Sequence, residues 1–156
     1  KKYLIILKKY LIILAHHKNI EIEDKDMGYR SDVVLAVSKE MTPHFLTVLA
    51  RSQRVRELVS YADVFDKDYA DGGMLMYWSG VKWYESYEDV AAIDKFVCDC
   101  ENEDLEGWNS TVDGEARANA EWTHIRFVRI GEEFDDIQCK GEFSYDTINI
   151  QRSIEF

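Results

Sequence analysis

The chain has 156 residues, which is enough for one domain with a sizeable hydrophobic core. A hydrophobic content of 46% excludes a disordered chain, because such chains bury too little apolar surface to fold. The formal net charge of −11 is unevenly distributed. Residues 1–60 carry 11 Lys and Arg against 7 Asp and Glu, whereas residues 61–156 carry 8 against 23. This acidity argues against direct nucleic-acid binding by the C-terminal part.

Cysteine content and N-terminal hydrophobicity indicate the compartment. Cys98, Cys100 and Cys139 are an odd number of thiols and too few for a disulfide scaffold, so we expect them to be reduced. They also do not predict a zinc site, which needs four ligands and usually two-residue spacings. The first apolar run has five residues and ends at Lys8, too short for export or for spanning a bilayer. We therefore predict a cytoplasmic protein without membrane contact.

Residues 1–7 and 8–14 are identical heptapeptides, Lys-Lys-Tyr-Leu-Ile-Ile-Leu. We predict the second copy as the first strand, and interpret the first as a disordered or cloning-derived duplicate that is prone to aggregate.

His16 and His17 follow this strand. Neighbouring side chains of an extended chain point to opposite faces, so the pair does not predict a metal site. Residues 20–23 alternate in polarity and predict a further short strand.

The next segments mix strand and helix signals. Residues 31–38 are β-branched and fit a buried strand, but they also fit a short helix. A firmer helix is predicted over about residues 42–63, with Thr42 as its N-cap and Pro43 at the first helical position, where the missing N–H costs nothing. Residues 63–71 are interpreted as an acidic connector. Its carboxylates do not follow the order of a calcium-binding EF-hand loop.

The clearest local pattern runs from residue 72 to residue 98. Two aromatic-rich strands are predicted on either side of Ser79-Gly80, because glycine accepts the positive φ of a tight hairpin turn. A helix follows over about residues 87–99, with Ser86 as its cap and an apolar stripe at helical spacing. We expect this hairpin and helix to form the mechanical centre and to hold the acidic segments at their two ends near each other.

The remaining chain is predicted as an acidic loop followed by strands. The loop covers about residues 99–121. The strand over 124–130 changes its apolar phase, which indicates a bulge or a strand buried on both faces. A carboxylate-rich turn over 131–136 precedes strands predicted over 137–143 and 147–156. Strands around two main helices, in one domain covering residues 1–156, predict an α+β fold with a mostly antiparallel sheet.

Catalytic motifs do not occur in this sequence: G-x-S-x-G, the P-loop, G-x-G-x-x-G and H-E-x-x-H are all absent. Thirty acidic residues guarantee carboxylate pairs by chance, and no apolar environment marks one of them as a proton donor. Nucleophilic catalysis would require Ser or Cys beside a histidine in space. We name no catalytic residue and no cofactor, and a small enzyme with a His/carboxylate site is kept as an alternative.

The features that are present favour an interaction protein. Acidic residues gather in three clusters within predicted loops or element ends, where their carboxylates are expected to face water, and aromatic residues such as Trp78, Trp83, Tyr84 and Tyr87 are candidate apolar anchors. We predict the following as partner-binding: Asp63, Asp66, Asp68, Asp71, Asp99, Glu101, Glu103, Asp104, Glu106, Trp108, Glu132, Glu133, Asp135 and Asp136.

Such a surface fits a basic partner. Because proteins bind DNA phosphates largely through Lys and Arg, spaced carboxylates can occupy the same basic groove. We therefore predict a small acidic interaction protein, in its sharpest form a nucleic-acid-mimicking inhibitor of a DNA- or RNA-processing host protein, of the kind that phages and mobile elements carry. A second alternative is a nucleic-acid-binding module that uses Arg51, Arg54, Arg56 and the hairpin aromatics. The overall charge counts against it.

Overall fold

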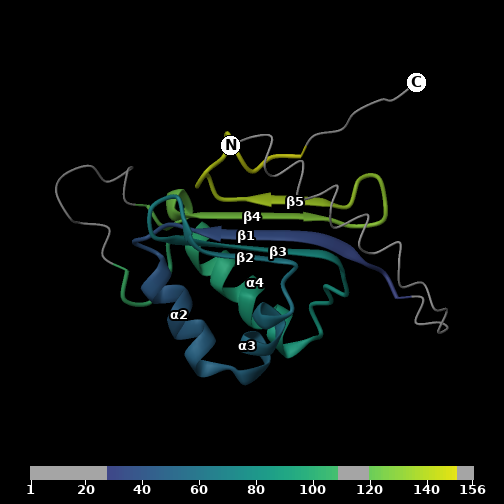
Figure 1. The fold of residues 1–156 in the computed structure, drawn as a ribbon, viewed down its shortest axis with the longest axis horizontal. Helices are drawn as coiled ribbons and strands as arrows, with labels where there is room; N and C mark the ends of the chain where they lie inside the picture. Colours follow the sequence, from purple (N-terminus) through teal and green to yellow (C-terminus); the bar gives the residue numbers. More distant parts are fainter. Residues whose placement is uncertain (1–27, 109–119, 151–156) are drawn as a thin grey trace.

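A computed structural model describes residues 28–108 and 120–150 of the chain. They form a five-stranded antiparallel sheet with helices packed on one face (Figure 1), so the predicted α+β class is confirmed. The described elements are, in chain order, β1 (Ser31–Val37), α2 (Thr42–Arg51), α3 (Gln53–Ser60), β2 (Val64–Tyr69), β3 (Gly73–Val81), α4 (Glu88–Glu101), the 3₁₀ helix η1 (Glu121–His124), β4 (Ile125–Ile130) and β5 (Ile137–Lys140).

Strand β1 lies at the centre of the sheet, whose order is β2-β3-β1-β4-β5. It pairs antiparallel with β3 on one side and with β4 on the other. Val33, Leu35 and Val37 are fully buried. The choice between strand and helix that residues 31–38 left open is thereby decided, because a strand flanked on both sides suits a β-branched sequence.

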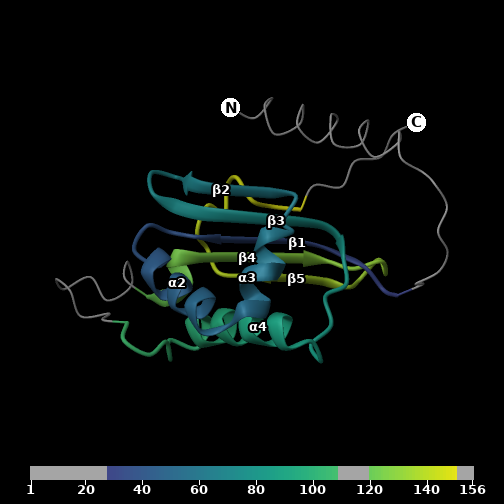
Figure 2. The same cartoon turned by 60° about the horizontal axis from the view of Figure 1, so that its bottom comes forward.

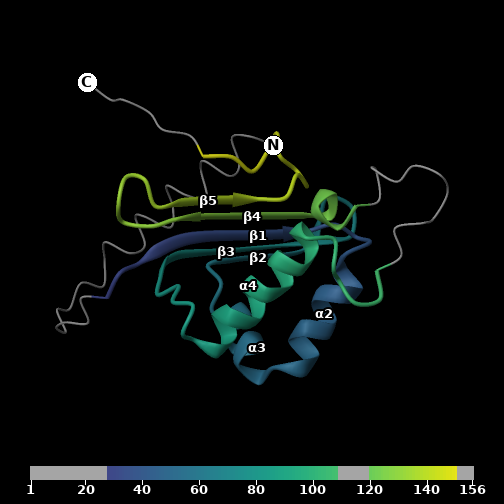
Figure 3. The same ribbon diagram turned by 180° about the vertical axis from the view of Figure 1, so that it is seen from behind.

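The core lies between the sheet and the helical layer. Figure 2 shows α2, α3 and α4 in front of the sheet, and Figure 3 shows from behind that they lie below it on one of its faces. Alternate side chains of β1, β3 and β4 meet Phe45 of α2, Val55 and Val59 of α3, and Ile93 of α4 in one buried cluster. Trp78 of β3 is 2% exposed and donates its indole N–H to the Leu58 carbonyl at 2.8 Å. Its expected role as a binding anchor is therefore wrong.

The helix predicted over 42–63 forms two helices. The backbone is extended at Ser52, and the Ser52 hydroxyl accepts the Val55 N–H at 3.3 Å, which caps α3. Arg56 donates to the carbonyl of Leu49 at 2.6 Å, at the end of α2. The apolar stripe continues across the break, so periodicity alone did not reveal it. Met41, rather than Thr42, occupies the N-cap position of α2.

The hairpin predicted at Ser79-Gly80 is wrong, because β3 continues through it to Val81. Gly80 does have a positive φ of 62°, but it lies where the β1–β3 register shifts, and its N–H donates to Asp32 Oδ1 at 2.8 Å. Glycine thus permits a bulge here rather than a turn. The turn lies earlier, at residues 70–72, and residues 64–69 of the predicted connector form strand β2.

Helix α4 confirms the second predicted helix with different ends. Its N-cap position is Tyr87, and no side chain caps it, so the predicted Ser86 cap is wrong. Glu88 and Asp89 in the first turn interact favourably with the helix dipole instead. The helix continues to Glu101, so the first residues of the predicted acidic loop are helical. No helix in the described ranges has the length and apolarity needed to cross a bilayer.

Strand β4 confirms the prediction for residues 124–130, and residues 125–128 are buried on both faces. Its register with β1 is regular, which excludes the bulge considered from sequence. Strand β5 ends at Lys140, because Gly141 turns the chain with a φ of 74°. Residues 147–150 are not in a strand, contrary to the prediction for 147–156.

Several predictions fall outside the described residues and stay predictions. They concern the duplicate over 1–7, the strands over 8–14 and 20–23, the pair His16-His17, and residues 109–119 and 151–156.

We predict that Gly141→Ala destabilises the fold by about 3 kcal/mol or more. An added Cβ would lie 2.1 Å from the Ile125 carbonyl oxygen, in addition to the strain of a positive φ. Gly107→Ala is the matched control, because its φ is 82° but its nearest neighbour lies 3.9 Å away, so it carries only the backbone cost of about 1–2 kcal/mol. Urea unfolding followed by tryptophan fluorescence measures both. Equal losses would contradict the packing argument.

Candidate functional site

The described residues are strongly acidic, with 11 Lys and Arg against 23 Asp and Glu. Among the 13 carboxylates predicted as partner-binding, Asp99 and Asp136 are partly buried and the others are exposed, in agreement with the expectation that most face water. Their positions differ from the predicted loops. Asp66 and Asp68 lie in edge strand β2, and Asp99 and Glu101 in the last turn of α4.

The later part of the acidic segment 63–71 and the acidic segment 99–106 meet at one end of the sheet. The ring of Tyr69, at the end of β2, contacts the ring of Phe143 with centroids 6.1 Å apart. Two residues before Phe143, the N–H of Gly141 donates to Glu101 Oε1 at 2.9 Å. The segment 141–146 therefore connects the end of β2 with the end of α4, a role that was expected of the hairpin.

This segment adds acids that sequence reasoning missed. Glu142 and Asp146 are exposed, and nothing near them in the sequence marks them, because Glu101 and Gly141 are 40 residues apart. We call the resulting surface the acidic end. It comprises Asp68, Asp71, Glu101, Glu103, Asp104, Glu106, Glu142 and Asp146.

Backbone and indole contacts hold the acidic end in place. Glu103 Oε1 accepts the Trp122 indole N–H at 3.0 Å, and Trp122 in turn accepts the Glu142 N–H through its carbonyl at 2.9 Å. Lys95 pairs with Asp99 at 2.5 Å one turn earlier in α4. Helix end, 3₁₀ helix and segment 141–146 are thus tied to one another, which fixes the spacing of the exposed carboxylates.

An open depression of about 440 Å³ lies within the acidic end. It is lined by Glu101, Trp122, Arg126, Gly141, Glu142 and Tyr145. Arg126 is 6% exposed and donates to the carbonyls of Gly141 at 2.8 Å and Ile148 at 3.1 Å, with the Tyr145 ring 5.2 Å from its guanidinium. Its hydrogen bonds explain why a buried arginine is tolerated in this position.

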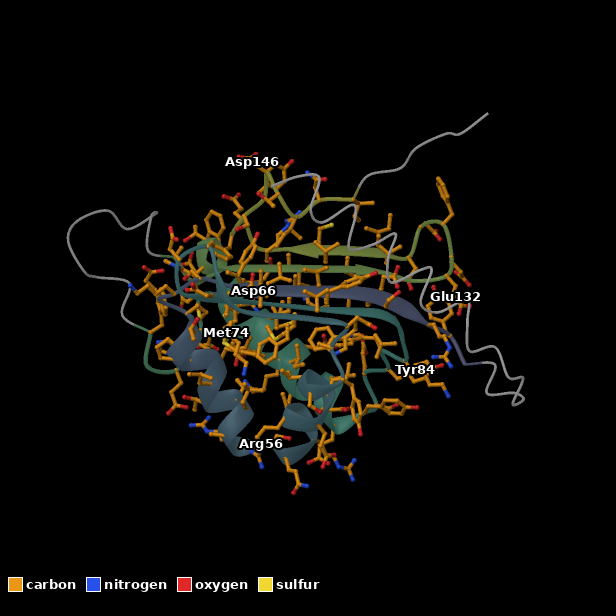
Figure 4. The ribbon with its side chains drawn as sticks, in the orientation of Figure 1. Arg56, Asp66, Met74, Tyr84, Glu132 and Asp146 are labelled. Carbon is orange, nitrogen blue, oxygen red and sulfur yellow. The ribbon has the colours of Figure 1, made fainter. Side chains whose placement is uncertain are left out.

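The third acidic cluster, which comprises Glu132, Glu133, Asp135 and Asp136, lies at the opposite end of the sheet, in the β4–β5 loop. Figure 4 shows Glu132 at that end, apart from Asp66 and Asp146. Asp63 belongs to this end as well, because its Oδ2 accepts the Ser79 N–H at 2.7 Å. The 13 predicted carboxylates therefore do not form one continuous surface.

Two carboxylates of this loop have structural roles. Asp136 forms a bidentate ion pair with Arg129 and accepts a hydrogen bond from the Tyr29 hydroxyl at 2.6 Å. Glu132 Oε1 accepts the Arg30 N–H at 2.9 Å. The Tyr29 hydrogen bond, followed by the Arg129 guanidinium, holds the pKa of Asp136 below its usual value. The loop is therefore fastened to the start of β1, and its acidity is partly neutralised.

Two of the predicted aromatic anchors, Trp78 and Trp83, are buried in the core, whereas Tyr87 is 43% exposed. Trp83 is 7% exposed, and its ring lies 5.6 Å from that of Trp78 in the core. Trp108 is half-buried between the rings of His44 and His124, at 5.3 and 4.9 Å. Burial removes Trp78 and Trp83 from a contact surface, and the partner-binding role of half-buried Trp108 stays a prediction. Tyr145 and Trp122 at the acidic end are better placed, a position that only the tertiary structure reveals.

The structure brings a serine beside a histidine, as the enzyme alternative requires. Ser38 Oγ lies 2.8 Å from His124 Nδ1, and Glu40 Oε2 lies 3.6 Å from the same nitrogen. A catalytic triad places serine and acid on different ring nitrogens. Ser38 Oγ also accepts the Met41 N–H at 3.2 Å, before α2. This geometry favours a structural contact between η1 and the connection from β1 to α2.

The thiols do not converge on a metal site. Lys140 Nζ lies 3.2 Å from Cys98 Sγ on the helical side of the sheet, so strand alternation turns Cys139 to the other face. Cys100 is buried in the core, and this burial raises the pKa of its thiol to about 12. Within residues 28–108 and 120–150, no group of three or more His, Cys, Asp or Glu could hold a metal ion.

Two of the three arginines of the nucleic-acid alternative, Arg54 and Arg56, have partners within the chain. Arg54 pairs with Glu88 at 3.4 Å, and Arg56 donates to backbone carbonyls of α2. Glu57 and Glu88 line the same open depression of about 410 Å³ as Arg51 and Arg54. Carboxylates within this patch disfavour phosphate binding.

Comparisons of the chain with protein-family models, with curated proteins and with solved structures give no match.

We predict that Asp136→Asn lowers stability at pH 7 by about 1.5–3 kcal/mol, the range for hydrogen bonds to charged groups. Because the pKa of Asp136 is lowered in the folded state, its contribution is present above the unfolded pKa near 3.9 and is lost as the pH falls through the folded value. The difference between wild type and variant should therefore shrink in acid. Urea unfolding at pH 7 and pH 3 measures it.

Asp135→Asn is the control for this prediction, since Asp135 is an exposed neighbour in the same loop. It should leave the free energy of unfolding within about 0.5 kcal/mol of wild type. A loss for Asp135→Asn equal to that for Asp136→Asn would show that loop charge, rather than the ion pair, is responsible.

Proposed function

We propose that the chain is a small acidic interaction protein whose acidic end binds a basic surface on a partner protein. One observation carries this proposal: segments distant in the sequence, around Asp71, Asp104 and Glu142, bring exposed carboxylates to one end of the sheet. Each segment alone is an ordinary solvated stretch. Their combination is a directional source of negative potential.

Electrostatics supports this reading. The described residues hold 12 more acidic than basic side chains, and carboxylates at one end of them attract a cationic partner over about a Debye length, roughly 8 Å at physiological salt. Such fields accelerate encounter and suppress partners of like charge. The hydrogen bonds of Glu101 and Glu103 keep the surface preorganised, so little ordering is required on binding.

The chemistry of the partner follows from the charge. Proteins that bind DNA or RNA present Lys and Arg to phosphates, and a row of fixed carboxylates competes for the same side chains. We therefore propose a nucleic-acid-processing protein as the partner, with inhibition by occupation of its basic groove. Glu132 lies at the other end of the sheet, and the N–H of Glu133 next to it donates to the Tyr29 hydroxyl before β1. The proposed contact therefore uses the acidic end and does not run along the whole molecule.

We predict that the triple variant Asp104→Asn/Glu106→Gln/Glu142→Gln binds a nona-arginine peptide about tenfold more weakly than wild type. Three interface charges at roughly 0.5 kcal/mol each account for this factor. The variant Glu85→Gln/Glu133→Gln/Asp135→Asn is the matched control, since it removes the same charge from exposed sites elsewhere. Titration calorimetry at low and physiological salt measures the affinities, and wild-type binding should weaken as salt rises.

The same proteins, immobilised and loaded with the heparin-binding fraction of a cell lysate, test the proposed partner class. Wild type should capture nucleic-acid-binding proteins that added DNA displaces, and the triple variant should capture far less than its control. Equal weakening in both variants would show that net charge alone, and no particular surface, is involved. Direct binding of DNA by the purified chain would overturn the proposal.

A further inference from the structure

The sheet has a second face that the helices do not cover. Because Val33, Leu35 and Val37 point into the core, the residues between them point the opposite way. The register of the neighbouring strands extends this rule across the sheet. We call the result the outer face; its larger apolar residues are Val34, Val64, Leu75, Tyr77, Val128, Ile130 and Ile137.

Within residues 28–108 and 120–150, the chain covers only part of the outer face. The segment 141–150 lies on it, held by the hydrogen bonds of Arg126 and by the ring contact of Phe143. Figures 1 and 3 show α2, α3 and α4 on the opposite side. Val34, Leu75 and Tyr77 remain partly accessible. An apolar sheet face of this kind normally packs against another layer, since each Å² removed from water stabilises by about 25 cal/mol.

The N-terminal 27 residues can reach this face. They directly precede Gly28, three residues before the central strand begins. Residues 15–27 span up to about 45 Å when extended. Five strands at about 4.8 Å spacing make a sheet about 24 Å wide. Residues 3–14 can therefore contact any part of the outer face from their point of attachment.

The composition of this segment matches the face. Residues 3–7 and 10–14 are both Tyr-Leu-Ile-Ile-Leu, so each offers five consecutive apolar side chains. Residues 1–27 also carry six Lys against four Asp and Glu, opposite in sign to the rest of the chain. The exposed carboxylates of Asp32 and Asp66 point from the outer face. Apolar and electrostatic complementarity thus point to the same occupant.

We propose that residues 3–14 of the same chain dock on the outer face and complete the fold with a third layer. The duplicated heptapeptide supplies the apolar contact, and its lysines lie near the carboxylates of Asp32 and Asp66. Attachment through a short linker gives the segment an effective concentration in the millimolar range, which a second copy of the chain reaches only in concentrated solution. The segment is thus an intramolecular partner of the sheet.

A native thiol allows a direct test. Cys139 is exposed and belongs to the outer face, Cys98→Ala removes the other accessible thiol, and Cys100 is buried with a raised pKa. A nitroxide on Cys139 of the full chain should broaden the NMR signals of residues 3–14. The control label at Gln53→Cys, in a Cys98→Ala/Cys139→Ala background, lies in the helical layer and should leave these signals sharp. Sharp signals of residues 3–14 with the Cys139 label would overturn the proposal.

Two further measurements distinguish the segment from other occupants. Ile6→Asp/Ile13→Asp should abolish the broadening, whereas His16→Asp/His17→Asp adds the same charges outside the heptapeptides and should retain it. Broadening that survives Ile6→Asp/Ile13→Asp would overturn the apolar contact.

Mixing spin-labelled chain with isotope-labelled chain that lacks the nitroxide reports contacts between molecules. Broadening that occurs only in this mixture, with a dimer in sedimentation analysis, would assign the outer face to a second copy and overturn the proposal.

Discussion

The pairing of β1 with two antiparallel neighbours is the constraint on which the rest of the structure depends. This strand has partners on both edges, and its Val33, Leu35 and Val37 form the floor of the core. Helices α2, α3 and α4 bury that floor from one side. The strand also sets which residues of β3 and β4 face inward, because the register transmits its alternation across the sheet. The two faces of the molecule, one packed and one partly open, both originate in this strand.

The acidic end shows how contacts distant in sequence create a surface. Gly141 ends β5 and lets the chain turn back, so that its N–H meets Glu101 and Phe143 meets Tyr69. These contacts bring Glu142 beside the carboxylates at the end of α4. Across the sheet, Asp136 and Glu132 fasten a loop to the start of β1. Similar acidic clusters thus have different roles. One provides exposed charge, and the other mainly stabilises the fold.

Local patterns predicted elements well where one period dominated. Helix α4 and the class of fold follow from apolar spacing. The failures occurred where a residue has two possible uses. Gly80 adopts the positive φ that a hairpin needs but forms a bulge, and Ser52 breaks a helix whose apolar stripe continues across it. Trp78 and Trp83 are of a residue type that is common in interfaces, but both are buried in the core. In each case partners from other elements, absent from the local pattern, decided the outcome.

The amino-acid sequence by itself determined the α+β class, the excess of acid in the C-terminal part and the exposure of most of its carboxylates, because these depend on composition and short-range periodicity. Only the tertiary structure decided which acids stand together. Their grouping depends on strand order and on the return of residues 141–146 to α4, contacts that join residues about 40 positions apart. Charge is a property of residues, whereas a charged surface is a property of the fold.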